Sequence, residues 1–266
     1  MEAVNIAEVF ISCKKEKHYS REVMLSQPAL VRVMSGEVRI AAADRVFNFF
    51  AGDTLLIPRN QLGRMSKLPL DGAPCIAISV VFRPEVLRQY YEAQPVNVFT
   101  PYEPAIMVLP DHPLLESLFN SLTPYFKLAD ALPTDLAVFK MEEAIRVLRS
   151  IDKNVDNILG KFEEPGKLDL MGFMEKNYMF NLSLERFGYL TGRSLTTFKK
   201  DFRNAFKCSP GRWLTQKRLE LAHYQLSEKK RKPSEIYLDV GFEDLSHFSF
   251  AFKKQFGYNA TNLPAH

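Results

Sequence analysis

The amino-acid sequence predicts an α+β protein with an N-terminal β domain and a C-terminal all-α domain. Short segments rich in Val, Ile and Phe fill residues 8–95, where glycine, proline and aspartate separate them at the spacing of a sandwich or barrel. From residue 113 onward apolar residues recur at helical spacing, most regularly in 182–257. These patterns predict a β domain at 1–95, a helical segment at 96–152, a linker at 153–166 and a helical domain at 167–266.

Length and composition are those of an ordinary globular protein. The 266 residues suffice for two domains with their own cores, and 46% hydrophobic with 25% charged residues is a typical balance. The sequence lacks the run of about 18 apolar residues that a membrane span needs, and its N-terminus lacks the basic region of a signal peptide. Cys13, Cys75 and Cys208 are scattered, which is typical of inert thiols in a reducing compartment. We expect a cytoplasmic protein with no membrane partner.

Positive charge is concentrated in the C-terminal part. Residues 164–266 hold 17 Lys and Arg against 11 Asp and Glu, a net charge of +6. Residues 1–163 hold the remaining 18 and 20, a net charge of −2. A basic domain of this kind suits a polyanion, although a solvated surface can carry the same charge.

The β domain offers few candidates for a ligand site. The segment LVRVMSGEVRI contains Arg32 and Arg39, and Arg64 lies between the segments TLLIP and IAISVVF. These arginines either line a ligand pocket or lie on strand surfaces, and we favour the second interpretation. Histidines are missing between His18 and His112, so we expect no metal and no cofactor in this domain.

Two helices are expected between the β domain and the linker. The first begins near Pro113, and the second runs from Thr134 to Ile151. The second helix has apolar residues spaced 4, 3, 4, 3, the pattern of a helix that pairs with its symmetry mate in a homodimer: Ala137, Met141, Ala144, Leu148 and Ile151. The alternative is a helix packed on its own β domain. Gly160, Pro165 and Gly166 mark the linker that follows.

Residues 182–206 have the pattern of a helix-turn-helix unit. A short apolar helix precedes Gly192, which can turn the chain at positive φ, and Ser194, which suits the N-cap of a second helix. The inner stripe of that helix is Leu195, Phe198, Phe202 and Phe206. Its outer face carries Thr196, Lys199, Lys200 and Arg203. A basic, hydroxyl-bearing face is what entry into a DNA major groove requires, although a solvated helix face looks the same.

The same plan recurs after a longer helix. That helix has Ser209 as its cap, Pro210 at its first position and an apolar stripe from Trp213 to Leu226. The second unit has Gly241 in its turn and Asp244 as the cap of its last helix. The inner stripe of the last helix is Phe248, Phe252 and Phe256, and its other faces carry Ser246, His247, Ser249, Phe250, Lys253 and Lys254.

Three segments in this order resemble the DNA-binding domain of AraC/XylS-type transcription regulators: LSLERFGYLTGRS, SPGRWLTQKRLELA and VGFEDLSHFSFAFKKQFG. The resemblance covers residues 167–266. SGEVRI followed by AGDTLLIPRN is similar to the cupin-type jelly roll found ahead of many such regulators. FKMEEAIRVL, LMGFMEKNY and LTTFKKDF look most like the branch that contains activators of type III secretion.

The resemblance implies which residues contact DNA. Thr196, Lys199 and Lys200 match base-reading positions, and Arg203 matches a backbone contact. The full set of expected DNA contacts is Ser194, Thr196, Thr197, Lys199, Lys200, Arg203, Ser246, His247, Ser249, Phe250, Lys253 and Lys254. The second unit departs from the family at Tyr237, Leu245, Phe250, Ala260 and Pro264. With fewer cations at the groove, we expect this unit to read DNA shape or thymine methyl groups, and more weakly.

The sequence therefore predicts a transcription regulator, specifically an activator, with double-stranded DNA and RNA polymerase as partners. No catalytic residues are expected, because nucleophile, metal-protease and phosphate-loop motifs are missing. The N-terminal domain is expected to sense an effector, to dimerise, or both. The alternative is control by a protein partner, an anti-activator that binds the N-terminal domain in place of a small molecule.

Overall fold

The structure is a computed structural model that describes residues 4–6, 9–14, 19–43, 45–96, 106–127, 134–162 and 166–262. The chain divides into two compact units, Met1–Phe162 and Glu163–His266. The β region and the helical segment that the sequence separates at residue 95 therefore lie in one unit.

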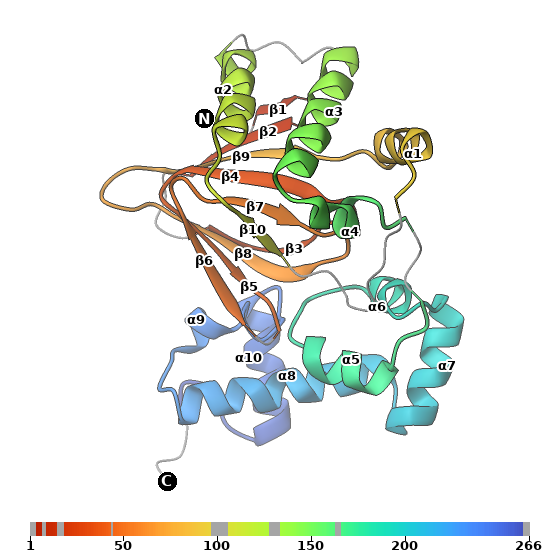
Figure 1. Ribbon diagram of the computed structural model, residues 1–266. Coiled ribbons are helices and arrows are strands. Elements are labelled where there is room, and N and C mark those ends of the chain that lie inside the picture. The colour runs from red at the N-terminus through yellow and green to blue at the C-terminus, as the bar shows by residue number, and fades with distance from the viewer. Residues whose placement is uncertain are drawn as a thin grey trace. The chain divides into compact units, whose positions relative to one another are not determined.

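The N-terminal unit contains two antiparallel sheets (Figure 1). The six-stranded sheet has the order β1-β2-β9-β4-β7-β10, and the four-stranded sheet has the order β3-β8-β5-β6. The strands are β1 Val4–Ile6, β2 Val9–Lys14, β3 Tyr19–Met24, β4 Ala29–Ser35, β5 Glu37–Ala41, β6 Val46–Phe50, β7 Thr54–Ile57, β8 Leu62–Leu68, β9 Cys75–Val81 and β10 Met107–Leu109. Gly36, at φ +74°, joins β4 to β5, where a Cβ would lie 2.7 Å from the Cys75 Cα atom. Only glycine fits that turn.

Both faces of the six-stranded sheet are covered, because successive residues of a strand point to opposite sides. Along β4, Val31 and Val33 belong to the core between the sheets, whereas Leu30 belongs to the core on the other face. Three helices cover that other face (Figure 1): α1 Pro84–Ala93, α2 Pro113–Lys127 and α3 Thr134–Ile151. The near-continuous apolar runs of the central strands follow from this double covering.

The α3 stripe packs on the chain's own core. Ala137, Met141, Ala144 and Leu148 are completely buried against the outer face of the sheet, and Ile151 packs beside them. This packing supports the alternative interpretation, a helix packed on its own β domain, for the four buried residues, whereas Ile151 is half-buried. Over two heptads an intramolecular stripe and a dimer stripe have the same spacing, so periodicity alone does not separate them. The homodimer itself stays a prediction.

The predicted linker begins too early. A 3-10 turn at Lys153–Val155 and helix α4, Asp156–Leu159, continue the N-terminal unit, and Val155, Ile158 and Leu159 are buried in its core. The Asp152 carboxylate caps the turn by accepting a hydrogen bond from the Asn154 amide at 2.8 Å. Residues 163–165 lie outside the described residues. Helix α1 inside the expected β region and strand β10 inside the expected helical segment are not predicted from the sequence.

Among the described residues, apolar side chains form a buried core between the two sheets. Val33, Val38, Ile40, Phe49 and Leu55 are among the buried residues there. The void beside them has a volume of about 10 Å³ and is lined by Leu25, Ile40, Ile57, Gln61, Gly63 and Met65. A void of that size holds about one water molecule.

Two of the three arginines considered for a ligand pocket bond to neighbouring strands. Arg32 donates from Nη1 to Thr54 Oγ1 at 2.9 Å, and its Nη2 atom lies 3.8 Å from the Asp111 carboxylate. Arg39 donates from Nε to Asn48 Oδ1 at 3.0 Å across the β5–β6 pair. The structure favours the strand interpretation for both, and Arg64 is half-buried on β8.

The C-terminal unit is helical, and its elements follow the predicted order. They are α5 Leu170–Asn177, α6 Leu184–Leu190, α7 Leu195–Phe206, α8 Pro210–Ser227, α9 Pro233–Ile236 and α10 Leu245–Phe256. Helix α8 contributes Trp213 and Leu214 to a first core with α5–α7, and Leu219 and Ala222 to a second core with α9 and α10. One helix therefore carries two helix-turn-helix units.

Candidate nucleic-acid interface

Helix α7 has one buried face and one exposed face. Its N-cap is Ser194, whose Oγ accepts a hydrogen bond from the Thr197 amide at 3.3 Å. Phe198 and Phe202 are completely buried. All six residues expected to contact DNA on this helix and its cap are exposed: Ser194, Thr196, Thr197, Lys199, Lys200 and Arg203. The structure thus brings them together on one face.

Arg193 fixes the turn that leads into α7. Its Nε donates to Asp201 Oδ2 at 3.0 Å, and its Nη1 donates to the carbonyl oxygens of Leu168 at 3.1 Å and Thr191 at 2.6 Å. The hydrogen bond from Arg193, with the charge of Lys167, lowers the pKa of the Asp201 carboxyl. Three acceptors on one guanidinium hold the turn in a single geometry. Arg193 is not among the residues predicted from the sequence, where its only signal is its place after Gly192.

Helix α10 has the same plan with a different outer face. The Asp244 carboxylate caps it by accepting from the His247 amide at 2.6 Å, and Phe248 and Phe252 are completely buried. The six expected contact residues are all exposed: Ser246, His247, Ser249, Phe250, Lys253 and Lys254. The Ser249 hydroxyl donates to the Leu245 carbonyl at 2.7 Å, so its own helix uses that donor.

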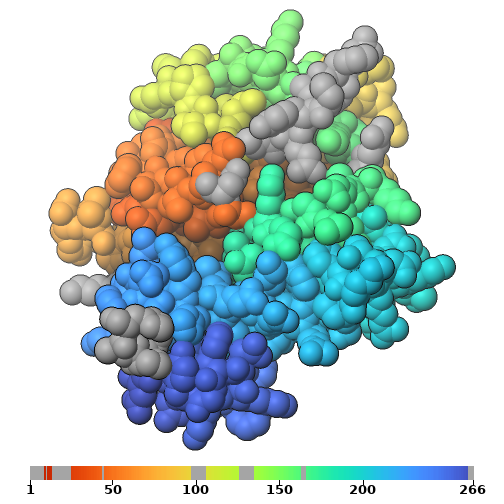
Figure 2. All heavy atoms as spheres, turned by 90° about the horizontal axis from the view of Figure 1, so that it is seen from below, coloured from red at the N-terminus to blue at the C-terminus, as the bar shows by residue number. Residues whose placement is uncertain are grey.

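Helices α7 and α10 can be aligned position by position. Both have 12 residues, and the caps Ser194 and Asp244 set an offset of 50 positions between them. That offset places Phe250 where α7 has Lys200. The Phe250 side chain is 69% exposed, so a bare phenyl ring occupies the position of a hydrogen-bond donor. In Figure 2 the cyan surface of the first unit and the dark blue surface of α10 form separate patches.

A basic loop connects α8 to α9. Lys229, Lys230 and Lys232 are exposed. Arg231 instead anchors the loop by donating to Gln225 Oε1 at 2.9 Å and to the Glu235 carbonyl at 3.0 Å, with the Asp239 carboxylate 2.9 Å away. The loop directly precedes the first helix of the second unit, the helix that crosses the DNA backbone in helix-turn-helix proteins.

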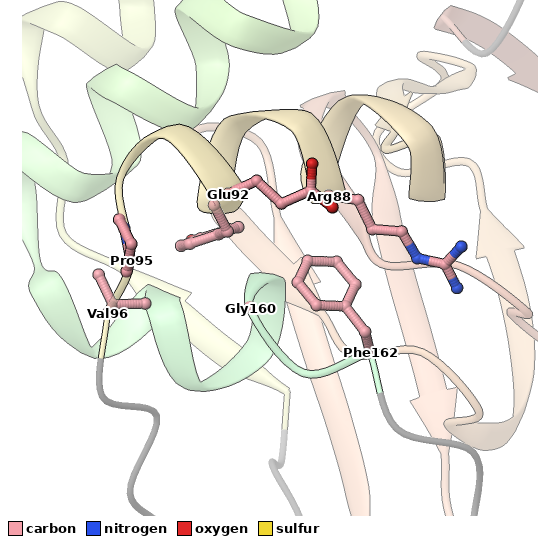
Figure 3. A pocket seen from close by; sticks show the side chains of 7 residues that line it. Arg88, Glu92, Pro95, Val96, Gly160 and Phe162 are labelled. Carbon is pink, nitrogen blue, oxygen red and sulfur yellow. The ribbon is translucent and has the colours of Figure 1, made fainter.

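A shallow hollow lies on the N-terminal unit between α1 and the segment after α4 (Figure 3). Its volume is about 250 Å³, and its walls include Arg88 and Glu92 of α1, with the Phe162 ring facing that helix across the hollow. Beneath it, Asp156 accepts from the Tyr91 hydroxyl at 2.7 Å and lies 2.9 Å from Arg149 Nε. The hollow has both charged and aromatic walls, as small-molecule sites do.

The described part of the chain contains neither a cluster of metal-binding side chains nor a helix that could span a membrane. Within it, no three His, Cys, Asp or Glu side chains gather closely enough to hold a metal ion. Among the same residues, no helix combines the length and the apolar character of a transmembrane segment.

Two family models match the chain. The model of the ExsA N-terminal regulatory domain matches residues 28–156, and a helix-turn-helix domain model matches residues 190–263. The HTH-type transcriptional regulator ExsA of Pseudomonas aeruginosa is 24% identical over 228 residues, which cover 85% of this chain and 81% of ExsA. The virulence regulon transcriptional activator VirF of Yersinia enterocolitica is 34% identical over 88 residues. That match covers 33% of this chain and only about a third, 32%, of the length of VirF.

Among solved structures, apo ToxT from Vibrio cholerae aligns with 97% of both chains at 12% identity and a TM-score of 0.48. The matched families and the ExsA and VirF relatives are regulators of transcription and not enzymes, as the sequence predicts. Matches to a regulatory domain over 28–156 and to a helix-turn-helix domain over 190–263, together with ExsA along most of the chain, show one family. The chain belongs to the AraC/XylS family of transcription regulators, in the branch of ExsA and VirF.

Proposed function

We propose that this protein activates transcription by placing α7 and α10 in successive major-groove segments, about 34 Å apart on one face of the DNA. The observation that carries the proposal is the outer face of α7, where hydroxyl and cationic side chains are exposed above a buried phenylalanine stripe. The similar protein VirF is a transcriptional activator, which supports activation rather than repression. The two sheets of the N-terminal unit also support its interpretation as a cupin-type jelly roll.

The roles of the α7 side chains follow from their chemistry. Lys199 and Lys200 can donate to guanine acceptors, and the methyl group of Thr196 can contact thymine. Arg203, one turn further along the exposed face, suits a phosphate and positions the helix without reading sequence. On α10, Phe250 can contribute only apolar contacts, so the second unit is expected to read DNA more weakly.

Transcription in vitro tests the sign of regulation. RNA polymerase would transcribe a promoter that the protein binds, with and without the purified protein. We expect more transcript in its presence. A lower yield on every bound promoter would make the protein a repressor, and an unchanged yield would remove RNA polymerase from its expected partners.

The basic loop is expected to contact the phosphate backbone. Replacing Lys229, Lys230 and Lys232 together with glutamine should lower the slope of log affinity against log salt by roughly 2–3, because each phosphate contact contributes about 0.9. The preference for operator over random DNA should stay the same, since phosphates carry no sequence information. Fluorescence anisotropy over a series of salt concentrations measures both quantities.

A matched variant controls for the loss of charge. Lys153→Gln removes an exposed cation from the N-terminal unit and should leave the slope unchanged. A triple variant with the wild-type slope would show that the basic loop does not contact DNA.

For the N-terminal unit we propose control by a protein partner, with a small-molecule effector as the alternative. The buried apolar core that the described residues form between the sheets supports control by a protein partner, because a ligand at that place would have to displace those side chains. The hollow between α1 and Phe162 is where a small molecule has room. The purified protein should therefore bind its operator with nothing added. If binding appears only after a small molecule is supplied, the alternative holds.

A further inference from the structure

Arg218 joins the linker helix to the first helix-turn-helix unit. It projects from the middle of α8, half-buried, toward the connector between α5 and α6. Its Nε donates to the Tyr178 carbonyl at 2.8 Å, and its Nη2 donates to the Phe180 carbonyl at 2.8 Å. Two charge-assisted hydrogen bonds from one planar group fix both the distance and the orientation of that connector.

The turn of the second unit packs on the same arginine. Gly241, between α9 and α10, has φ +92°. A Cβ atom there would lie 2.7 Å from Arg218 Nε and 2.7 Å from the Met179 carbonyl oxygen. Both the positive φ and the close approach require glycine. The backbone of the second turn therefore rests directly on Arg218 and on the connector of the first unit.

A second contact crosses between the two units beside the arginine. Asn181 Nδ2, on the connector, donates to Glu243 Oε1, on the residue before the α10 cap, at 2.8 Å. The connector leads into α6 and α7, and the Gly241 turn leads into α10. The two recognition helices are thus tied to each other by contacts additional to helix α8. We name Arg218, Gly241 and the Asn181–Glu243 pair the brace.

We propose that Arg218 is a positioning residue that fixes the separation and rotation of α7 relative to α10. The consequence is that this protein accepts operators with a single spacing between the two DNA segments it contacts. The proposal rests on the proposed function and adds a determinant of specificity that touches no base. It applies to the two helix-turn-helix units within residues 166–262.

The geometry of DNA sets the size of the effect. One inserted base pair moves the second segment by about 3.4 Å along the axis and turns it by about 35°. Hydrogen bonds to base edges fail beyond about 3.5 Å, so a rigid pair of helices cannot keep both sets of contacts. With the brace removed, the two units can adjust by bending at their connections to α8. This bending lets both units keep their contacts on the altered operator. It also lowers affinity for the natural operator, because the two helices are no longer held in the matching arrangement.

The experiment compares two DNA duplexes, the operator and the same operator with one base pair inserted between its two contacted segments. We expect the full-length wild-type protein to bind the second at least tenfold more weakly. For Arg218→Ala the ratio of the affinity for the natural operator to that for the altered operator should fall below threefold. The affinity for the natural operator should itself drop several-fold. Glu243→Ala, which removes only the surface contact, should give an intermediate ratio.

Lys217→Ala is the matched control. It removes a cation from the adjacent position of α8, where Nζ pairs with Glu175 at 3.1 Å and lies over the Trp213 ring. Because that contact stays within the first unit, the control should keep the wild-type ratio. Should Arg218→Ala fail to fold, Arg218→Lys takes its place, since one ammonium group cannot reproduce the planar pair of donors.

The outcomes separate the brace from the proposed function. A folded Arg218 variant that still loses tenfold or more on the altered operator contradicts the brace. So does a wild-type protein that binds both duplexes equally well. A wild-type protein that prefers neither duplex over random DNA would instead contradict the proposed function.

Discussion

Replacing Lys200 with alanine is expected to weaken operator binding by roughly 5- to 150-fold, the 1–3 kcal/mol of a good base contact. Lys200 is exposed on the outer face of α7, above the buried Phe198 and Phe202, so the helix itself should be unaffected. Binding to random DNA should change far less, because that binding depends on phosphates. Fluorescence anisotropy with labelled operator and random duplexes measures the two affinities, and thermal unfolding checks the fold.

The matched position on α10 provides the comparison. Phe250→Ala should reduce operator affinity by less than Lys200→Ala, because the phenyl ring offers apolar contact in place of a donated hydrogen bond. His247→Ala should behave similarly, since its ring packs edge-on against Phe242 with centroids 5.5 Å apart. If either α10 variant loses as much affinity as Lys200→Ala, the second unit reads DNA as strongly as the first.

Removing the carboxylate of Asp156 is expected to destabilise the N-terminal unit by about 2–4 kcal/mol, the cost of breaking a mostly buried ion pair. Asp156 Oδ1 lies 2.9 Å from Arg149 Nε, whose Nη1 also donates to the Tyr90 hydroxyl at 3.1 Å. Burial and the hydrogen bond to Asp156 raise the pKa of Tyr91, so its hydroxyl remains a donor. Asp156→Ala leaves a guanidinium and a phenol without this acceptor.

Urea unfolding measures the effect of Asp156→Ala and localises it. The single tryptophan, Trp213, lies in the C-terminal unit, so its fluorescence reports on that unit. The circular dichroism transition should shift while the tryptophan transition stays in place. Glu142→Ala breaks a pair at the surface of α3, 3.4 Å between half-buried Glu142 and exposed Arg146, and should cost under about 0.5 kcal/mol. Equal effects of the two substitutions would show that the buried pair does not stabilise the unit.

The recognition helices are the part of the fold that the sequence predicts best, because their signals are local. Ser194 and Asp244 cap helices whose inner phenylalanines recur every four residues, and the structure places both sets as expected. Expected contact residues are exposed on both helices. The caps and stripes needed no knowledge of distant segments.

The features that the sequence does not predict all depend on contacts between residues that are distant in the chain. The α3 stripe from Ala137 to Leu148 has the spacing of a dimer seam, and only the sheet beneath it shows where it packs. Asp156 reads as part of a polar linker until Tyr91, 65 positions earlier, is placed beside it. Arg218 bonds to carbonyl groups 38 and 40 positions away, which no local pattern records. Pro264, noted as a departure from the family, lies outside the described residues.

Whether α7 reads DNA sequence is tested by a genome-wide pull-down. Fragmented genomic DNA would be captured by the purified protein at two salt concentrations and sequenced. We expect a shared motif of about two helical turns that persists at the higher salt concentration, with its best-defined bases lost when the Lys200→Ala variant is used instead. Retention without a common motif, disappearing as salt rises, would mean binding through phosphates alone and would contradict base reading by Thr196, Lys199 and Lys200.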